Sequence, residues 1–202
     1  MHFDPENVLA FWFGPAAEDP AEASARGTFW FGASGEADAA VRERFGSAVE
    51  AAARGDLDPW LEAPRSALAL VLTLDQFPRN ISRGAAEAFA HDEKALRAAK
   101  ATLGRGHLNR LAPIERAFLA LPFQHSESID DQREAVRLSS EIARTAPGPW
   151  RPLLENYLDY AKQHLALIVR FGRFPHRNLV LGRTSTAEEE KYLAEGGATF
   201  GQ

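Results

Sequence analysis

The sequence contains no cysteine among its 202 residues. Disulfide bonds, thiolate metal sites and a cysteine nucleophile are therefore excluded. Because the chain has no disulfide framework, a reducing compartment is the simpler interpretation. Long apolar runs are missing too, since the longest, at residues 67–74, is far below the roughly 20 residues that a membrane-spanning helix needs. The first residues carry no basic leader before an apolar segment, which argues against a signal peptide. We therefore expect a cytoplasmic protein that does not associate with membranes.

An excess of positive charge is also lacking. The sequence has 28 acidic and 23 basic residues, a balance that argues against a general affinity for nucleic acid. Hydrophobic residues make up 45% and charged residues 25% of the chain, as in ordinary soluble proteins. Because this length suits one hydrophobic core, we expect a single domain that covers residues 1–202.

The common metal and nucleotide motifs are absent. There is no HExxH, no pair of histidines four residues apart and no EF-hand loop, so the spacing predicts no metal site. A site assembled from Asp75, His91 and His125 is the alternative left open, but no spacing favours it. The glycines at residues 104–106 lack the third glycine and the preceding strand of a dinucleotide-binding turn, so no cofactor is expected.

Apolar residues recur with helical spacing through most of the sequence, and no stretch alternates as a strand would. Start signals such as Asp4 with Pro5, or Thr186 with Glu189, precede several of these segments, and glycine or proline follows them. Residues 14–35 should form a loop whose aromatic cluster packs on the rest of the chain. We expect an all-α fold of about seven to nine helices, mostly in antiparallel pairs. The predicted helices cover residues 4–13, 34–55, 64–77, 85–90, 92–103, 113–121, 128–143, 150–174 and 186–195.

Two related pentapeptide patterns, QFPRN at residues 76–80 and FPHRN at residues 174–178, follow apolar helices. The prolines predict that these helices stop at Phe77 and Phe174, since a proline cannot donate to the preceding turn. A purely structural role accounts for such endings, because arginine interacts well with the carboxyl end of a helix and asparagine tolerates the left-handed conformation.

The local charge gives the second pattern a further interpretation. No acidic residue lies between Asp159 and Glu188, although the chain as a whole is acidic. The basic residues of this interval are Lys162, Arg170, Arg173, Arg177 and Arg183. If the two Phe-Pro segments lie close in the fold, Arg79 and Arg177 could hold a carboxylate or phosphate between planar guanidinium groups.

A third polar segment, PFQHSE at residues 122–127, follows a proline that is predicted to end another helix at Leu121. His125 suits proton transfer or anion binding because it titrates near neutral pH. A catalytic pairing with Ser126 or Glu127 is less favoured, because neighbours in sequence usually point apart and Ser126 to Ser128 fit a loop and helix cap. In the resulting hypothesis His125 carries the proton, and the proposed ligand-binding residues are Arg79, Asn80, Gln124, Arg173, His176, Arg177, Asn178 and Arg183.

Several segments together resemble one known family, the bacterial domain of unknown function 924, from about Val8 to Leu193. The segments are FWFG at 11–14, FWF at 29–31, LDQFPRNISRG at 74–84, FAHDEKAL at 89–96, PFQHSES at 122–128 and RFGRFPHRNLVLGRTSTAEE at 170–189. The resemblance implies an all-helical fold similar to a tetratricopeptide superhelix. It implies no activity and no catalytic residues.

Three functional hypotheses follow. The first is a protein, enzymatic or not, that binds a small anion in a pocket lined by arginine and histidine. The second is a tetratricopeptide-like module that clamps an acidic peptide or protein partner in a groove. In the third, the arginines are structural and pair with carboxylates such as Asp75, Glu87 or Asp92. The positions of Arg79 and Arg177 should distinguish the three.

Overall fold

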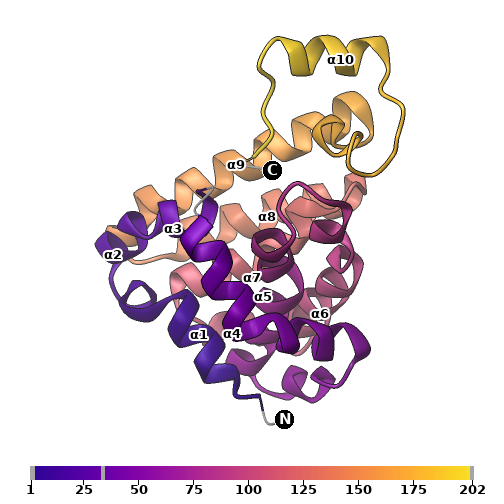
Figure 1. Cartoon of the computed structure of the whole chain (residues 1–202). Coiled ribbons are helices and arrows are strands. Elements are labelled where there is room, and N and C mark those ends of the chain that lie inside the picture. The colour runs from indigo at the N-terminus through magenta and orange to yellow at the C-terminus, as the bar shows by residue number, and fades with distance from the viewer. Residues whose placement is uncertain (1–2, 33–34, 201–202) are drawn as a thin grey trace.

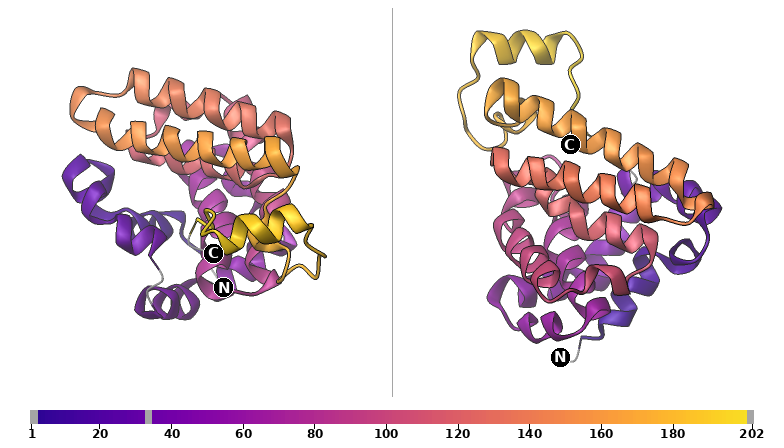
Figure 2. Two further views of the ribbon diagram at one scale, coloured as in Figure 1. Left: turned by 90° about the horizontal axis from the view of Figure 1, so that it is seen from above. Right: turned by 180° about the vertical axis from the view of Figure 1, so that it is seen from behind.

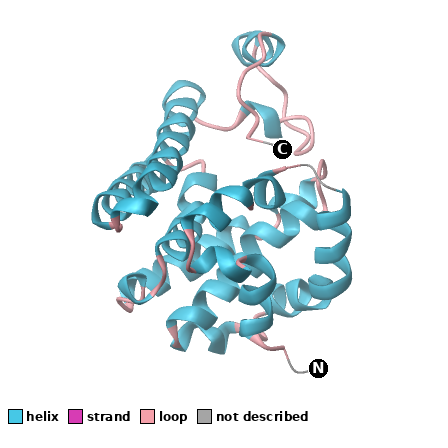
Figure 3. Cartoon of the chain, turned by 90° about the vertical axis from the view of Figure 1, so that its left-hand side faces the viewer, coloured by secondary structure: helices cyan, strands magenta, loops and turns pink. Residues whose placement is uncertain are grey.

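The computed structural model describes residues 3–32 and 35–200, and this part of the chain consists of helices and connecting loops without a strand (Figures 1 and 3). Its α-helices are α1 (Pro5–Trp12), α2 (Pro20–Ala25), α3 (Gly27–Phe31), α4 (Gly35–Arg54), α5 (Pro64–Ile81), α6 (Asp92–Gly104), α7 (Pro113–His125), α8 (Ile129–Thr145), α9 (Arg151–Phe171) and α10 (Ala187–Ala194). Six short 3₁₀ turns join them, at Gly14–Ala17, Asp58–Glu62, Ala86–Phe89, Leu108–Arg110, Gly148–Trp150 and Pro175–Arg177. Within these residues eight α-helices have eight residues or more, so the predicted all-α class is confirmed.

Most of the predicted helix starts are confirmed. Asp4 caps α1 by accepting a hydrogen bond from the amide of Glu6 at 2.9 Å, and Thr186 and Glu189 form the predicted capping box of α10. The predicted cap at Ser34 lies outside the described residues. Ser128 does begin α8, but its side chain makes no capping bond, so the predicted box at this end is wrong.

The prolines do not end helices where the sequence predicted. Helix α5 continues through Pro78 to Ile81, and α7 continues through Pro122 to His125. A proline inside a helix removes one backbone hydrogen bond, but both prolines are buried, and packing of the surrounding side chains offsets that loss. Helix α9 ends three residues before Phe174, because Gly172 takes the left-handed conformation at φ 70°, which glycine adopts without steric cost.

Residues 14–32 form short helices rather than the expected loop. Long-range contacts hold them in place, since the Arg26 Nε donates to the carbonyl of Trp12 at 2.7 Å and the Trp30 Nε1 donates to the same oxygen at 2.8 Å. The aromatic cluster packs on the core as predicted: Trp30 lies against Phe118 of α7, with ring centroids 4.8 Å apart. Such contacts have no local signal in the sequence.

Helix α5 lies at the centre of the molecule, as its apolar sequence predicted, and α1, α4, α6 and α7 all pack against it. Helices α7, α8 and α9 follow one another in sequence and pack side by side, which Figure 2 shows for α8 and α9. The tetratricopeptide-like superhelix and the single domain stay predictions.

The C-terminal part adds a small second cluster of buried residues formed by Leu167, Ile168 and Phe174. Helix α10 stands apart from the main body (Figure 1). Its buried Glu189 accepts hydrogen bonds from Arg173 at 2.7 and 2.8 Å and thereby ties α10 to the end of α9. No helix within residues 3–32 and 35–200 combines the length and apolar character needed to cross a membrane.

Candidate functional site

A cavity of ≈ 400 Å³ lies between the α2 and α3 segment, α5, α7 and α9. Its polar lining includes Gln76, Arg79, Gln124, His125 and His164, with Arg83 following α5 at the rim. Its apolar lining includes Phe31, Leu121, Leu153, Tyr157 and Phe200. Among the described residues that line it, Arg79 and Arg83 are the charged ones, and no carboxylate is present. The surface of this cavity is therefore suited to a ligand with an apolar body and an acidic group.

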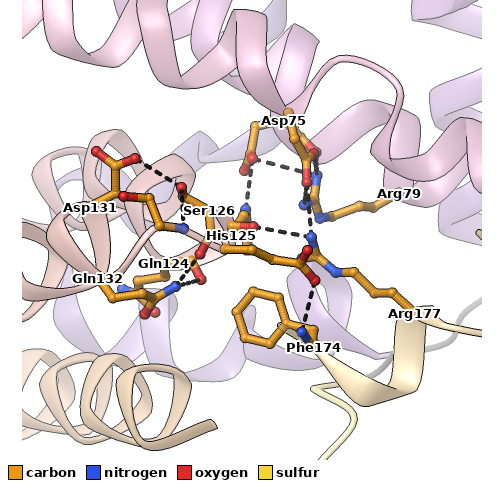
Figure 4. A network of polar contacts seen from close by, with 12 residues as sticks. Asp75, Arg79, Gln124, His125, Ser126, Asp131, Gln132, Phe174 and Arg177 are labelled. Carbon is orange, nitrogen blue, oxygen red and sulfur yellow. Dashed lines mark hydrogen bonds and ion pairs between the residues drawn. The ribbon is translucent and has the colours of Figure 1, made fainter. Parts of the chain in front are cut away.

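Asp75 and His125 form a hydrogen-bonded pair at the wall of the cavity (Figure 4). The Asp75 Oδ1 and His125 Nδ1 lie 2.7 Å apart, and the Gln76 Nε2 donates to the other carboxylate oxygen at 2.6 Å. Burial disfavours the charged carboxylate, but the attraction of Arg79 and the hydrogen bonds from His125 and Gln76 outweigh burial and lower the pKa of Asp75. Asp75 is therefore ionised at neutral pH.

The charge state of His125 follows from its surroundings. Burial and the repulsion of Arg79 outweigh the attraction of Asp75 and lower the pKa of the imidazole. Because an ionised carboxylate can only accept, the proton of the neutral ring must lie on Nδ1, which leaves a lone pair on Nε2. The Nε2 atom has no hydrogen-bond partner in the described part of the chain. His125 is thus held in the tautomer of a proton acceptor.

The two Phe-Pro segments do lie close together in the fold, and the arginines of both segments contact the same carboxylate, that of Asp92. The Arg79 Nη2 donates to Asp92 Oδ2 at 2.9 Å, and the Arg177 Nη1 lies 3.3 Å from the same oxygen. Arg177 also donates to the backbone carbonyl of His125 at 3.1 Å (Figure 4). Two arginines and two carboxylates, Asp75 and Asp92, therefore form a compensated cluster, which is the pairing that the third hypothesis expects, although Arg79 also lines the cavity.

The predicted ligand-binding residues divide into two groups. Arg79, Gln124 and His125 line the cavity. Asn80, Arg173, His176, Arg177, Asn178 and Arg183 do not. In this second group Asn80 donates to Asp38, Arg173 pairs with Glu189, and Arg183 pairs with Glu127. Asn178 donates to Glu189, and the His176 ring packs near Phe174 and Phe200.

The inference of uncompensated charge after Asp159 is therefore wrong. Each basic residue of that interval has an acidic partner: the partners of Lys162, Arg170, Arg173, Arg177 and Arg183 are Asp159, Glu188, Glu189, Asp92 and Glu127. Two of these carboxylates, Asp92 and Glu127, come from segments far away in the sequence. An acid-free stretch of sequence does not imply an acid-free neighbourhood in the fold.

His164 of α9 is the main pocket residue that the sequence did not suggest. Its Nδ1 donates to the carbonyl of Tyr160 at 2.8 Å, and its ring stacks on Phe200 with centroids 3.6 Å apart. Burial is the main reason that the pKa of His164 falls to about 3. The sequence did contain a signal for this residue. Tyr157, Ala161 and His164 share one face of a helix, and a histidine within such an apolar stripe is unusual.

No group of three or more histidines or carboxylates that could hold a metal ion occurs in residues 3–32 and 35–200. The set of Asp75, His91 and His125 left open above does not form such a group. Ser126 does not act with His125 either, since its hydroxyl donates to Asp131 at 2.9 Å (Figure 4). The residues that line the cavity can form hydrogen bonds, and His125 and His164 could transfer protons.

The neutral state of His164 predicts a pH dependence of stability. The imidazole takes up a proton near pH 6.5 in the unfolded chain but only near pH 3 in the fold. Below pH 6.5 the unfolded state thus binds more protons, and stability falls as the pH falls toward 3. We expect His164 to contribute a loss of about 2 kcal/mol between pH 8 and pH 5.

Chemical denaturation at these two pH values, in the parent and in His164→Phe, measures this contribution, because the variant lacks the titrating group. Long-range ¹H–¹⁵N spectra report the protonation state directly. A His164 ring that titrates near pH 6.5 in the folded protein would contradict the prediction.

Comparisons with known proteins agree with this fold. Residues 8–197 match the sequence profile of the family described as bacterial protein of unknown function (DUF924). A solved structure described as a protein of unknown function, ATU0120 from Agrobacterium tumefaciens, is 38% identical and superposes with a TM-score of 0.80, covering 95% of this chain and 97% of the other. A comparison with curated proteins finds no match. The chain belongs to the DUF924 family of bacterial proteins of unknown function.

Proposed function

We propose that the cavity binds a small organic acid and that His125 accepts a proton there. The observation that carries this proposal is the buried pair of Asp75 and His125 at the wall of a pocket whose charged lining residues are two arginines. A histidine held by a carboxylate is an efficient general base, because the carboxylate fixes the tautomer and stabilises the imidazolium that forms. The protein would then be an enzyme that removes a proton from its ligand or from water.

A single carboxylate suits the site better than a phosphate. Arg79 already pairs with Asp92, and Arg83 pairs with Asp38 at 2.8 Å, so both guanidinium groups are largely neutralised. A doubly charged phosphate would need more compensation than these two arginines can give. The side-chain amide of Gln124 is buried, lines the cavity and makes no hydrogen bond to the described residues, so it is available to orient the acid.

The alternative, a module that binds an acidic peptide, has less support. It needs arginines spread along an open groove. Arg173 and Arg183 instead use two nitrogens each to hold Glu189 and Glu127. An acidic peptide would have to break these pairs in order to bind.

Two arginine variants test the proposal. Arg83 and Arg173 each pair with one carboxylate, and their side chains are 27% and 28% exposed, but only Arg83 lines the cavity. We expect Arg83→Gln to weaken the binding of a small carboxylate about tenfold, which corresponds to one lost charge-assisted hydrogen bond. Arg173→Gln should leave the affinity unchanged.

The measurement is thermal shift and calorimetric titration with a panel that contains acetate, benzoate, phenylacetate, succinate and inorganic phosphate. Binding of a carboxylate should move the ring resonances of His125. The proposal fails if no carboxylate binds, or if both variants lose affinity equally.

A further inference from the structure

The cavity has a second imidazole on the wall opposite α7. His164 comes from α9, is 6% exposed and lines the cavity together with His125. The Tyr160 carbonyl can only accept, so the 2.8 Å contact requires the His164 proton to be on Nδ1. The remaining nitrogen, Nε2, has no hydrogen-bond partner among the residues that the structure describes.

The two histidines are thus built alike. Each is more than nine-tenths buried, and each directs its Nδ1 hydrogen to a fixed oxygen, the carboxylate of Asp75 or the carbonyl of Tyr160. Their ring centroids lie 6.3 Å apart. Both rings are neutral near pH 7, because burial lowers both pKa values. The cavity therefore offers two Nε2 acceptors that the fold leaves unused.

Because both histidines line the cavity, each Nε2 can accept a hydrogen bond from a donor that a ligand brings. A hydroxyl or an amine could supply that donor. An ammonium group is disfavoured, because Arg79 and Arg83 are the charged lining residues and no carboxylate of the described chain faces the cavity. A hydroxyl gives the donor without the charge.

The rest of the cavity defines the body of the ligand. Phe31, Leu121, Leu153, Phe200 and the ring of Tyr157 make its apolar wall. Phe31 is 46% exposed although it is a large apolar side chain, and Phe200 closes the cavity beside His164 by stacking on its ring. A volume of ≈ 400 Å³ holds a ring or a branched aliphatic group in addition to the acid.

We propose that the ligand is a hydroxy acid with an apolar side group, whose hydroxyl lies between His125 and His164 and donates to the His164 Nε2. This inference rests on the proposed function, since it names the class of acid that the same cavity binds. His164 acts as a second acceptor that selects acids with a hydroxyl over acids without one. The acid group lies toward Arg79, Arg83 and Gln124. The apolar group lies against Phe31 and Leu153.

The test uses two matched pairs of acids that differ by one hydroxyl, phenylpropanoate with phenyllactate and isocaproate with hydroxyisocaproate. In each pair we expect the hydroxy acid to bind the parent protein at least about tenfold more tightly, because a site built to pair with a hydroxyl discriminates strongly against its absence. In His164→Phe, which keeps a ring against Phe200, the affinity for the hydroxy acid should drop to that of its partner. Affinity for the acid without a hydroxyl should stay the same.

His107→Phe is the control, since His107 is also a buried histidine with an unpartnered Nε2 but does not line the cavity. It should keep the preference for hydroxy acids. His164→Asn, whose amide can replace the bond to the Tyr160 carbonyl, provides a second variant if His164→Phe does not fold. Equal affinity within both pairs, or a preference that survives in both His164 variants, overturns the inference and leaves the proposed function standing. If none of the four acids binds, the inference is overturned, and the proposed function is overturned with it only if no carboxylate of the first panel binds either.

Discussion

An Asp75→Ala variant should lose about 3 to 5 kcal/mol of unfolding free energy, the range seen when one partner of a buried ion pair is removed. Asp75 is 1% exposed and lies 3.5 Å from the Arg79 Nη1, as well as 2.7 Å from the His125 Nδ1. The substitution would leave Asp92 as the only carboxylate partner of Arg79 and would leave the Nδ1 hydrogen of His125 without an acceptor. Buried polar groups that lose their partners pay the full cost of desolvation.

Urea denaturation at pH 7 measures this loss. The control is Asp130→Ala, because Asp130 pairs with Arg133 on the surface, where the side chains are 85% and 68% exposed, and such pairs contribute at most about 1 kcal/mol. Asp75→Asn preserves the shape of the side chain but removes its charge, so it shows how much of the loss is electrostatic. A loss below about 1 kcal/mol in Asp75→Ala would show that the cluster of Asp75, Arg79, Asp92 and Arg177 is not coupled as we infer.

The position of Asp75 also shows how far the sequence could predict the site. Ending the helix at Phe77, as Pro78 suggested, would have separated Asp75 from Arg79. Because α5 continues to Ile81, the two residues lie four apart on one helix face and Arg79 reaches Asp92. The favourable packing of a buried helix overrode a local stop signal.

Helix starts were easier to predict than helix ends. A cap such as Asp4 or Thr186 acts on amides two or three residues away, so its signal is local and readable. The short helices at residues 14–31 depend instead on contacts of Arg26 and Trp30 with the carbonyl of Trp12. Contacts across 14 to 18 residues leave no local periodic pattern.

The candidate site was only partly predictable for a related reason. Of the residues that the sequence suggested, Arg79, Gln124 and His125 line the cavity, and each lies in or next to a buried proline-containing segment. Arg173 and Arg183 were not, because their carboxylate partners lie 16 and 56 residues away, and charge along a sequence does not report charge in space. The Asp75 partner of His125 is likewise 50 residues distant.

The aromatic core supports the other wall of the cavity through Phe118 of α7. This fully buried ring contacts Trp12, Phe13 and Trp30 on one side, with centroids 5.9, 5.3 and 4.8 Å away. On the other side it stacks parallel to Phe31, at 5.9 Å and 4° between the planes. Phe118 thus connects the N-terminal aromatic residues to a residue that lines the cavity.

We expect Phe118→Ala to lose about 3 to 5 kcal/mol of unfolding free energy, the usual cost of removing a buried phenylalanine and leaving a cavity. The loss should fall toward the upper end, because few side chains could move into a space bounded by several large rings, so the void would collapse only partly. Phe31→Ala is the matched control. Since Phe31 is 46% exposed, the same substitution there should cost only about 1 kcal/mol, although it removes part of the pocket wall.

The two variants should therefore separate stability from binding. Phe31→Ala should stay folded and lose affinity for small acids, and Phe118→Leu, which keeps most of the volume, should cost at most about 1.5 kcal/mol. If Phe118→Leu binds ligand like the parent, the ring of Phe118 acts only through its volume. If it loses affinity as Phe31→Ala does, the parallel stack is needed to hold Phe31 at the cavity. The Phe118 ring has five aromatic neighbours, counting Tyr157 at 6.1 Å. Removing it should therefore cost more unfolding free energy than removing the half-exposed ring of Phe31. A loss in Phe118→Ala no greater than in Phe31→Ala would contradict the packing described above.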